Sequence, residues 1–381
     1  MAGPTKIGIL GCGVISGIYI ENSKKLDAIE LAAVADVNPT AARYRADQYG
    51  IPRALDPEAL LADPEIEIVI NLTPNRLHAQ VSTQILEAGK HVYSEKPLAV
   101  YREDSQRLLE LAGQRGLRVA NAPDTFLGGA WQTARKAIDD GLIGRPFAAM
   151  ATFHGRRPPA QQGGVPPSSP TRSTAPGAVS FFQSEGYKYG VTVHFDMGPY
   201  YLHNLINLLG PARRVTGVTS KLFEETDRFG TTTRVESPTH ATALIEFGNG
   251  ALAQLVETGD VYGTGLPNVE IYGSEGTLRC PDPNYFPGPV YLRKPESREL
   301  IELECKHSYN QDSRGVGVAD MAVAIKNGRP HRASGEMGAH AVDILNAIHE
   351  SAERGQRIDL ATTCAQPAPL PTGLANWTID E

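Results

Sequence analysis

The 381-residue sequence is poor in several features that mark particular classes of protein. Its four cysteines form no CxxC pair, which argues against disulfides or structural zinc and favours a reducing cytoplasm. No run of about 18 apolar residues occurs, so we expect no transmembrane helix, and the N-terminus lacks the layout of a signal peptide. Basic residues (36) are outnumbered by acidic ones (43), which argues against nucleic acid or an anionic membrane as a partner.

Patterns of two common catalytic chemistries are absent as well. Histidines and acids show no HExxH-like spacing, so we expect no metal site. No GxSxG element and no paired cysteine and histidine occur, so nucleophilic catalysis is not indicated. An apolar fraction of 41% and a charged fraction of 21% fit a globular protein, and the chain length predicts two domains.

Short apolar strands alternate with helical segments through the first third of the chain. We expect strands near 6–10, 29–36, 65–74, 90–97 and 117–123. Helices are expected from the first glycine turn toward Leu26 and at 41–49, 77–88 and 102–113. This alternation is typical of an α/β fold with a parallel, doubly wound sheet of the Rossmann type.

The turn after the first strand carries the pattern Gly11-x-Gly13-x-x-Ser16, with Val14 and Ile15 inside it. Its glycines allow a tight turn and close approach to a pyrophosphate, which the helix N-terminus then binds. Asp36 ends the second strand, where a carboxylate would bind ribose hydroxyls and repel a 2′-phosphate. NAD is therefore the expected cofactor, with NADP as the alternative; Asp36 could instead cap the helix ahead of Pro39.

Further candidate residues lie where the later strands end. Ligands of such sheets bind at the carboxyl ends of the strands. That position predicts Lys96 at the rim of the ligand site, the alternative being a structural ion pair. The strand ends carry Thr73, Pro74 and Asn75, then Glu95, Lys96 and Pro97, and finally Asn121.

Five stretches together resemble the Gfo/Idh/MocA oxidoreductases: GILGCGVISGIYI, AVADVNP, NLTPNRLH, EKPLA and DMGPYYLHNLINLLG. The resemblance spans about residues 5 to 360. It implies an NAD(P) domain at 1–126 and a C-terminal α/β domain at 127–360 with an open, mostly antiparallel sheet for substrate binding and subunit pairing, as a homodimer or homotetramer. It also implies that Lys96 faces the substrate hydroxyl, that the Lys96–Pro97 bond is cis, and that the dinucleotide is lined by Thr73, Pro74, Asn75, His78 and Glu95.

The acid–base candidates lie in the second domain, where we expect a helix from about Pro199 to Leu209. Spacing places Asp196, Tyr200 and His203 near one helical face. Many relatives have histidine where this chain has Tyr200, so either Tyr200 or His203 could carry the proton. An adjacent lysine cation and the oxidised nicotinamide would favour the tyrosinate. Lys96 would stabilise the developing alkoxide, and Asp196 would orient the pair.

Each of these candidates has a structural alternative. Asp196 could cap the helix, Tyr200 could be a core aromatic, and His203 could face a core partner. His154 and His194 alternate with apolar residues on expected strands and could reach the cleft. We take His154 as a substrate ligand together with Lys96, Asp196 and Tyr200.

The rest of the second domain is less specific. An amphipathic helix ends at Gly141, hairpin strands follow near 239–258 and 267–280, and two helices flank His331 and Arg332. Proline, glycine and serine at 155–178 predict no regular structure. The loop 155–190 could cover a sugar or form an inter-subunit arm with its aromatic residues Phe181, Phe182, Tyr187 and Tyr189. Residues 361–381 are expected to be an arm or a disordered tail.

These observations predict an NAD(P)-dependent oxidoreductase. It would interconvert a secondary alcohol or hemiacetal and a carbonyl on a sugar, polyol or glycoside. Two alternatives use the same scaffold: an NAD-dependent glycoside hydrolase that acts through transient oxidation, and a sugar sensor without catalysis. The presence of Lys96, Asp196 and a nearby proton carrier argues against the sensor, which needs no acid–base set.

Overall fold

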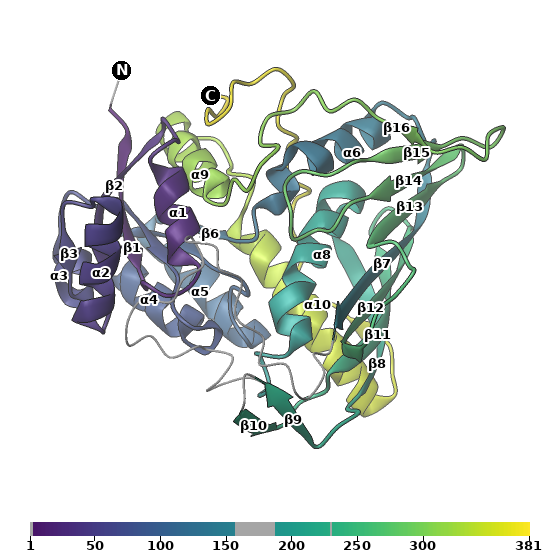
Figure 1. The fold of residues 1–381 in the computed structure, drawn as a ribbon, viewed down its shortest axis with the longest axis horizontal. Helices are drawn as coiled ribbons and strands as arrows, with labels where there is room; N and C mark the ends of the chain where they lie inside the picture. The colour runs from purple at the N-terminus through teal and green to yellow at the C-terminus, as the bar shows by residue number, and fades with distance from the viewer. Residues whose placement is uncertain (1–2, 157–186, 229–230) are drawn as a thin grey trace.

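The computed structural model describes residues 3–156, 187–228 and 231–381, and they form two α/β domains side by side (Figure 1). The first domain is built on a six-stranded sheet in the order β3-β2-β1-β4-β5-β6, and every pair in it is parallel. The predicted doubly wound sheet is confirmed. Its strands are β1 (Thr5–Leu10), β2 (Ile29–Ala35), β3 (Ala54–Leu55), β4 (Ile68–Asn71), β5 (His91–Ser94) and β6 (Val119–Asn121).

Helices cover both faces of this sheet because its strands are apolar on both sides. One face packs on α1 and α9, and the opposite face packs on α3, α4, α5 and α10. The bounds of these helices, and of α2, which also belongs to the first domain, are α1 (Ser16–Ser23), α2 (Pro39–Tyr49), α3 (Pro57–Ala62), α4 (His78–Glu87), α5 (Arg102–Arg115), α9 (Val316–Asn327) and α10 (Gly335–Arg354). The layers of the first domain are therefore completed by two helices from the C-terminal part of the chain, α9 and α10.

The start of α2 shows how local sequence sets these boundaries. The Asn38 side chain accepts a hydrogen bond from the Thr40 amide and caps the helix, and Pro39 occupies the first helical position. Gly50 ends the helix in the left-handed conformation, with φ at +64°. The cap belongs to Asn38, so the alternative role of Asp36 as the cap is wrong.

The second domain contains a nine-stranded sheet in the order β16-β15-β14-β13-β7-β12-β11-β8-β17. Among these strands β7 and β12 pair in parallel, and the other neighbours are antiparallel, so the expected mostly antiparallel sheet is confirmed. The strands are β7 (Pro146–Arg156), β8 (Ala212–Ser220), β11 (His240–Phe247), β12 (Leu252–Val261), β13 (Val269–Gly273), β14 (Gly276–Cys280), β15 (Tyr291–Arg293), β16 (Ile301–Glu302) and β17 (Ile358–Asp359).

Smaller elements join and flank the two sheets. A separate antiparallel hairpin is formed by β9 (Glu225–Arg228) and β10 (Thr231–Arg234). The short 3-10 turns η1 (Asn75–Leu77) and η2 (Thr125–Leu127) follow β4 and β6. Within the described ranges, no helix is both long and apolar enough to cross a membrane.

The two faces of the second sheet differ in what covers them. Helices α6 (Gly129–Asp139), α8 (Val193–Leu209) and α10 lie on the side that faces the first domain (Figure 1). The strand residues on that side, such as Ala151 and Leu255, are buried. The opposite side is open, and its apolar side chains Val218, Leu244 and Leu252 are 68%, 51% and 55% exposed.

Helix α8 begins at Val193, six residues before the expected start at Pro199, which lies inside the helix. A proline there cannot donate to the carbonyl four residues earlier, so sequence rules place it at a helix start. Most residues of α8 are buried between the sheet and α10, and this packing outweighs the lost hydrogen bond. His194 is therefore on a helix, and its predicted place on a strand is wrong.

The C-terminal residues 361–381 follow an extended path along the protein. The Leu370 amide donates to Gln132 of α6, and the Tyr309 hydroxyl donates to the Thr378 carbonyl. The Trp377 carbonyl accepts from the Asp27 amide of the first domain. This segment thus contacts both domains. Most of the loop 155–190, including Phe181 and Phe182, lies outside the described residues.

Candidate active site

The glycine turn between β1 and α1 is closed on one side and open on the other. At Gly11 φ is +108°, and a Cβ atom would lie 2.7 Å from the Leu72 carbonyl carbon, so the position requires glycine. At Gly13 a Cβ atom would have no neighbour within 4 Å. The first turn of α1 carries no acidic residue. Its amide groups can therefore receive an anion approaching over Gly13.

Two side chains hold the backbone of this glycine turn in place. The Ser16 hydroxyl donates to the Gly13 carbonyl at 2.7 Å, and the buried Arg45 guanidinium donates to the same oxygen at 3.0 Å. Val14 is 41% exposed and Ile15 is half-buried, so both flank the open side. This cradle has the shape that a dinucleotide pyrophosphate requires.

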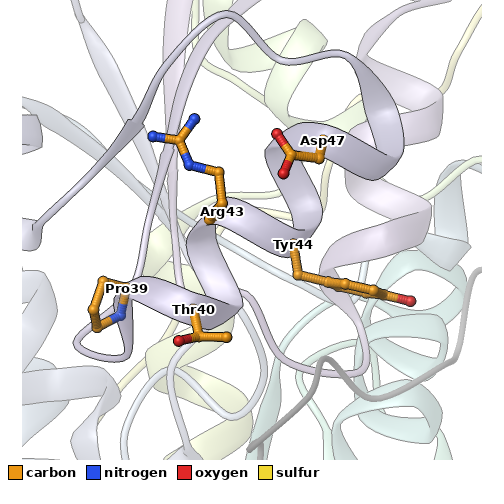
Figure 2. A pocket seen from close by; sticks show the side chains of 5 residues that line it. All are labelled: Pro39, Thr40, Arg43, Tyr44 and Asp47. Carbon is orange, nitrogen blue, oxygen red and sulfur yellow. The ribbon is translucent and has the colours of Figure 1, made fainter.

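Asp36 follows β2 and is held by two backbone amides. One carboxylate oxygen accepts from the Cys12 amide at 2.7 Å and the other from the Asn38 amide at 2.8 Å. These bonds fix the carboxylate beside the glycine turn, where it fits the hydroxyls of a ribose. The residues of α2 that follow line a surface groove, which Figure 2 shows with Pro39, Thr40, Arg43, Tyr44 and Asp47.

Two of the residues expected to line the dinucleotide, His78 and Asn121, are buried and bond to the backbone of the loops at the strand ends. His78, 1% exposed, has its ring nitrogens 2.7 Å from the Thr73 carbonyl oxygen and 2.6 Å from that of Pro97. The buried Asn121 amide donates to the Ser94 and Glu95 carbonyls. These side chains tie the ends of β4, β5 and β6 together, and their polar atoms point to the backbone.

Glu95 is also buried, and it links the loop to α1. Its carboxylate accepts from the Tyr19 hydroxyl at 2.9 Å and from the Lys96 amide at 2.8 Å. Thr73 and Asn75 are half-buried and Pro74 is exposed, so this loop retains surface for a ligand. The Lys96–Pro97 and Ala122–Pro123 peptide bonds are cis, which confirms the expectation for Lys96–Pro97.

Lys96 crosses from the first domain to the first turn of α8. Its ammonium donates to the Asp196 carboxylate at 2.5 Å and to the Asp196 carbonyl at 2.8 Å. The ammonium also lies 5.3 Å from the centre of the Tyr200 ring. Residues 100 positions apart thus form one cluster, with Lys96, Asp196 and Tyr200 as its members.

The charge of Lys96 is maintained in this cluster. Burial lowers the pKa of the Lys96 amine, but the neighbouring Asp196, Tyr200 and Glu95 outweigh burial and raise it above the ordinary lysine value. Lys96 is therefore a cation at neutral pH, suited to hold a developing negative charge and unsuited to accept a proton. Asp196 lies in the first turn of α8 after Thr192, the residue at the cap position, so its predicted alternative as the cap is wrong.

The structure does not place His203 with this cluster. Its ring is fully buried, lies edge-on against Phe126, and has Nδ1 3.2 Å from the Pro123 carbonyl oxygen. Burial lowers the pKa of His203 to about 3, so the ring is neutral. Of the two candidate proton carriers that the sequence left open, Tyr200 is the one beside Lys96.

His154 lies on β7, but on the open face of the second sheet. Strand register places it beside Thr258, which lies opposite His240, whereas Phe153 faces inward and contacts Tyr201. Side chains alternate along a strand, so the neighbour of an inward residue points out. His154 therefore does not face the cleft, which sequence alternation alone could not decide.

A small cavity of about 110 Å³ adjoins Asp196. Its walls combine apolar side chains, such as Phe153 and Met197, with the hydroxyl-bearing Thr192 and Thr239. Tyr187, from the loop 155–190, also lines this cavity, whereas Tyr189 of the same loop stacks on Tyr101. Within the described ranges, no group of three histidine, cysteine or acidic side chains is arranged to hold a metal ion.

Sequence reasoning missed Arg314, which precedes α9. Its guanidinium carbon lies 6.0 Å from the centre of the Tyr200 ring, and its side chain is 5% exposed. Nothing in the local pattern SRGVG marks it, because the residue is 114 positions from Tyr200 and is brought there by the packing of α9 on the first sheet.

Together, the glycine cradle, the fixed Asp36 carboxylate and the cluster of Lys96, Asp196 and Tyr200 fit a dinucleotide-dependent oxidoreductase. Family profiles agree: residues 5–122 match the oxidoreductase family with the NAD-binding Rossmann fold, and residues 131–279 match the GFO/IDH/MocA C-terminal domain. The chain belongs to the Gfo/Idh/MocA family of oxidoreductases, as its sequence motifs indicated.

Individual relatives carry related activities. The chain is 25% identical to the myo-inositol 2-dehydrogenase of Thermotoga maritima over 363 residues, 93% of this chain and 98% of that protein. It is 25% identical to the 1,5-anhydro-D-fructose reductase of Ensifer adhaerens over 93% of this chain and 98% of that one. A levoglucosan dehydrogenase solved with NADH and L-sorbose superposes with a TM-score of 0.78 at 20% identity, covering 95% of this chain and all (100%) of that one.

The buried histidine makes stability depend on pH. His203 has a pKa of about 3 in the fold against 6.5 as its ordinary value, so only the unfolded chain takes up this proton as pH falls below 6.5. Stability is fully present above 6.5 and is lost toward pH 3. His203→Asn should reduce the slope of unfolding free energy against pH by about 1.4 kcal/mol per unit in urea titrations.

A matched control separates this effect from a general loss of packing. Asn207→Ala alters a buried residue of the same helix that does not titrate, so it should lower stability equally at every pH. An unchanged slope in His203→Asn would show that the ring is protonated in the folded protein as well.

Proposed function

We propose that the protein oxidises a secondary alcohol or hemiacetal of a sugar or polyol with NAD, and catalyses the reverse reduction. The observation that carries the proposal is the contact of Lys96 with Asp196 beside Tyr200, at the carboxyl edge of the Rossmann sheet. A cation and a hydroxyl group that can carry a proton thus lie together at the edge of the sheet where the nicotinamide would bind.

The chain's own groups supply the proton chemistry. The C–H bond of the carbinol breaks with its electron pair while the O–H bond loses a proton, which leaves a carbonyl. NAD, when bound, accepts the hydride at its nicotinamide ring. Tyr200 as phenolate receives the hydroxyl proton, and Lys96 stabilises the negative charge that develops on the substrate oxygen. Asp196 orients the Lys96 ammonium through their ion pair.

The cavity beside Asp196 supports a small polyhydroxylated substrate. Apolar Phe153 and Met197 offer surface for the C–H face of a ring, whereas Thr192 and Thr239 offer hydroxyls. Relatives named for inositol, anhydrofructose and levoglucosan point to the same class of molecule.

The cofactor preference rests on Asp36. Its carboxylate is fixed by two amides and stands where an adenosine ribose would lie, so a 2′-phosphate would meet a fixed negative charge. The groove on α2 also contains Arg43, which would attract that phosphate. We take Asp36, which two backbone amides hold in place, as decisive and infer a preference for NAD.

Removing the side chain of Lys96 or the hydroxyl of Tyr200 from the cluster should strongly reduce turnover. Lys96→Met and Tyr200→Phe should each lower kcat by about two to four orders of magnitude, because they remove contacts made in the transition state. The measurement is NADH formation across a panel of sugars, inositols and glycosides. His203→Asn, a buried residue outside the cluster, is the control and should retain most of the activity.

The same assay separates the two other uses of this scaffold. Product formed from a glycoside without accumulated NADH would indicate hydrolysis through transient oxidation. Tight sugar binding without any product, with both cofactors and in both directions, would indicate a sensor. Full kcat in Lys96→Met would contradict the assigned chemistry itself.

The cofactor preference has its own test. Asp36→Ser removes the charge that would oppose a 2′-phosphate and should raise the affinity for NADPH relative to NADH by about tenfold or more. Fluorescence titration of both reduced cofactors measures this ratio without any substrate. Tighter NADPH than NADH binding in the unaltered protein would contradict the preference.

The open face of the second sheet is proposed as a contact between copies of the chain. Val218, Leu244 and Leu252 are exposed apolar residues on this face, and no helix of the described residues covers them. Sedimentation equilibrium should show a dimer or tetramer, and Leu244→Glu should shift it toward monomer because a charge would then be buried. A monomeric unaltered protein at micromolar concentration would rule this contact out.

A further inference from the structure

Tyr200 is flanked by two cationic side chains from different parts of the chain. The Lys96 ammonium lies 5.3 Å from the centre of its ring, and the Arg314 guanidinium carbon lies 6.0 Å from the same point. Burial lowers the pKa of Arg314, but the neighbouring Tyr200 and Asp312 outweigh burial and raise it well above the ordinary arginine value. In the proposed reaction Lys96 stabilises the charge on the substrate oxygen, whereas Arg314 has no assigned role.

Several contacts hold the Arg314 side chain in place. One terminal nitrogen donates to the Asp312 carboxylate at 2.6 Å, and the other donates to the Asn284 side-chain oxygen at 2.7 Å and to its carbonyl at 3.1 Å. With its side chain 5% exposed, the guanidinium has little freedom to leave the ring. These contacts fix its direction before any ligand binds.

The backbone at Arg314 is fixed as well. The buried Asp124 carboxylate accepts from the Gly315 and Gly317 amides, both at 2.9 Å, at the start of α9. Gly315 has φ at +103°, and at Gly317 a Cβ atom would lie 2.9 Å from the Tyr93 ring. The turn therefore depends on glycine at these positions and directs the preceding arginine toward Tyr200.

Each of the two cations beside Tyr200 is paired with a carboxylate that is more exposed to solvent than the cation itself. Asp196 forms an ion pair with Lys96, and its side chain is 29% exposed; Asp312 forms one with Arg314 and is 38% exposed. The other charged groups near the cluster are Glu95, bonded to Tyr19, and Asp124, bonded to the amides of α9. An arginine is charged at every relevant pH, so it supplies a permanent cation here.

We propose that Arg314 is a positioning residue that acts through Tyr200: it fixes the phenol and favours its ionised form, so that Tyr200 accepts the substrate proton. This inference rests on the proposed role of Tyr200 as proton carrier. The phenolate oxygen gains the proton that the substrate hydroxyl loses, and Arg314 itself neither gains nor loses one.

The test follows the ionisation of Tyr200 directly. In protein labelled with ¹³C at the tyrosine ring carbon bearing oxygen, the Tyr200 signal is assigned by its absence in Tyr200→Phe. Arg314→Met should move the pH at which this signal titrates upward by about 1 to 3 units. Arg314→Lys keeps a cation and should move it less.

Kinetics provide the second readout. The acidic limb of the kcat/KM profile should shift in the same direction, so activity near neutral pH should fall about tenfold or more in Arg314→Met. The affinity for NADH, measured by fluorescence, should be unchanged. The matched control is Arg279→Met, which removes an arginine paired with Glu270 on the second sheet and should leave both profiles in place.

An unchanged Tyr200 titration in Arg314→Met would overturn the inference. Should that variant not fold, Asn284→Leu removes one acceptor of the guanidinium, and a smaller upward shift is expected; no shift there would overturn it equally. A shifted titration in a protein without dehydrogenase activity would refute the proposed function and leave the Arg314–Tyr200 coupling standing.

Discussion

The ion pair between Lys96 and Asp196 is the contact on which the site depends. It joins the end of β5 in the first domain to the first turn of α8 in the second, and the lysine is 12% exposed. Taking two charges out of water is costly unless each is well paired, so this pair constrains how the domains meet. The end of β5 and the cavity beside Asp196 are adjacent because this pair joins them.

Buried polar groups behind the surface support this arrangement. His78 contacts the carbonyls of Thr73 and Pro97, Asn121 contacts those of Ser94 and Glu95, and Asp124 holds the start of α9. Buried polar atoms need partners, so each contact fixes one backbone segment of the rim. The segments that follow β4, β5 and β6 are thereby bonded to one another and to the start of α9.

Much of the first domain could be predicted because its signals are local. The glycines of the first turn, Asp36 after β2 and the alternating strands each follow from the conformations those residues allow. His78 and Asn121 lie at the ends of strands as expected, but their polar atoms bond to backbone carbonyls, because sequence does not show on which side of a loop a side chain lies. In the second domain the start of α8 was misplaced because burial outweighs the preference of Pro199.

The sequence alone thus determined the parallel sheet, the glycine turn after β1 and the place of Lys96 at the end of a strand, since these depend on residues close together in the chain. Tertiary structure decided which of the two candidate proton carriers lies beside that lysine. Tyr200 and His203 share one helical face by spacing, yet packing directs His203 to Pro123 and Tyr200 to Lys96. Tertiary structure also places Arg314 beside the Tyr200 ring. Such contacts between distant segments depend on how helices pack, so they leave no local pattern in the sequence.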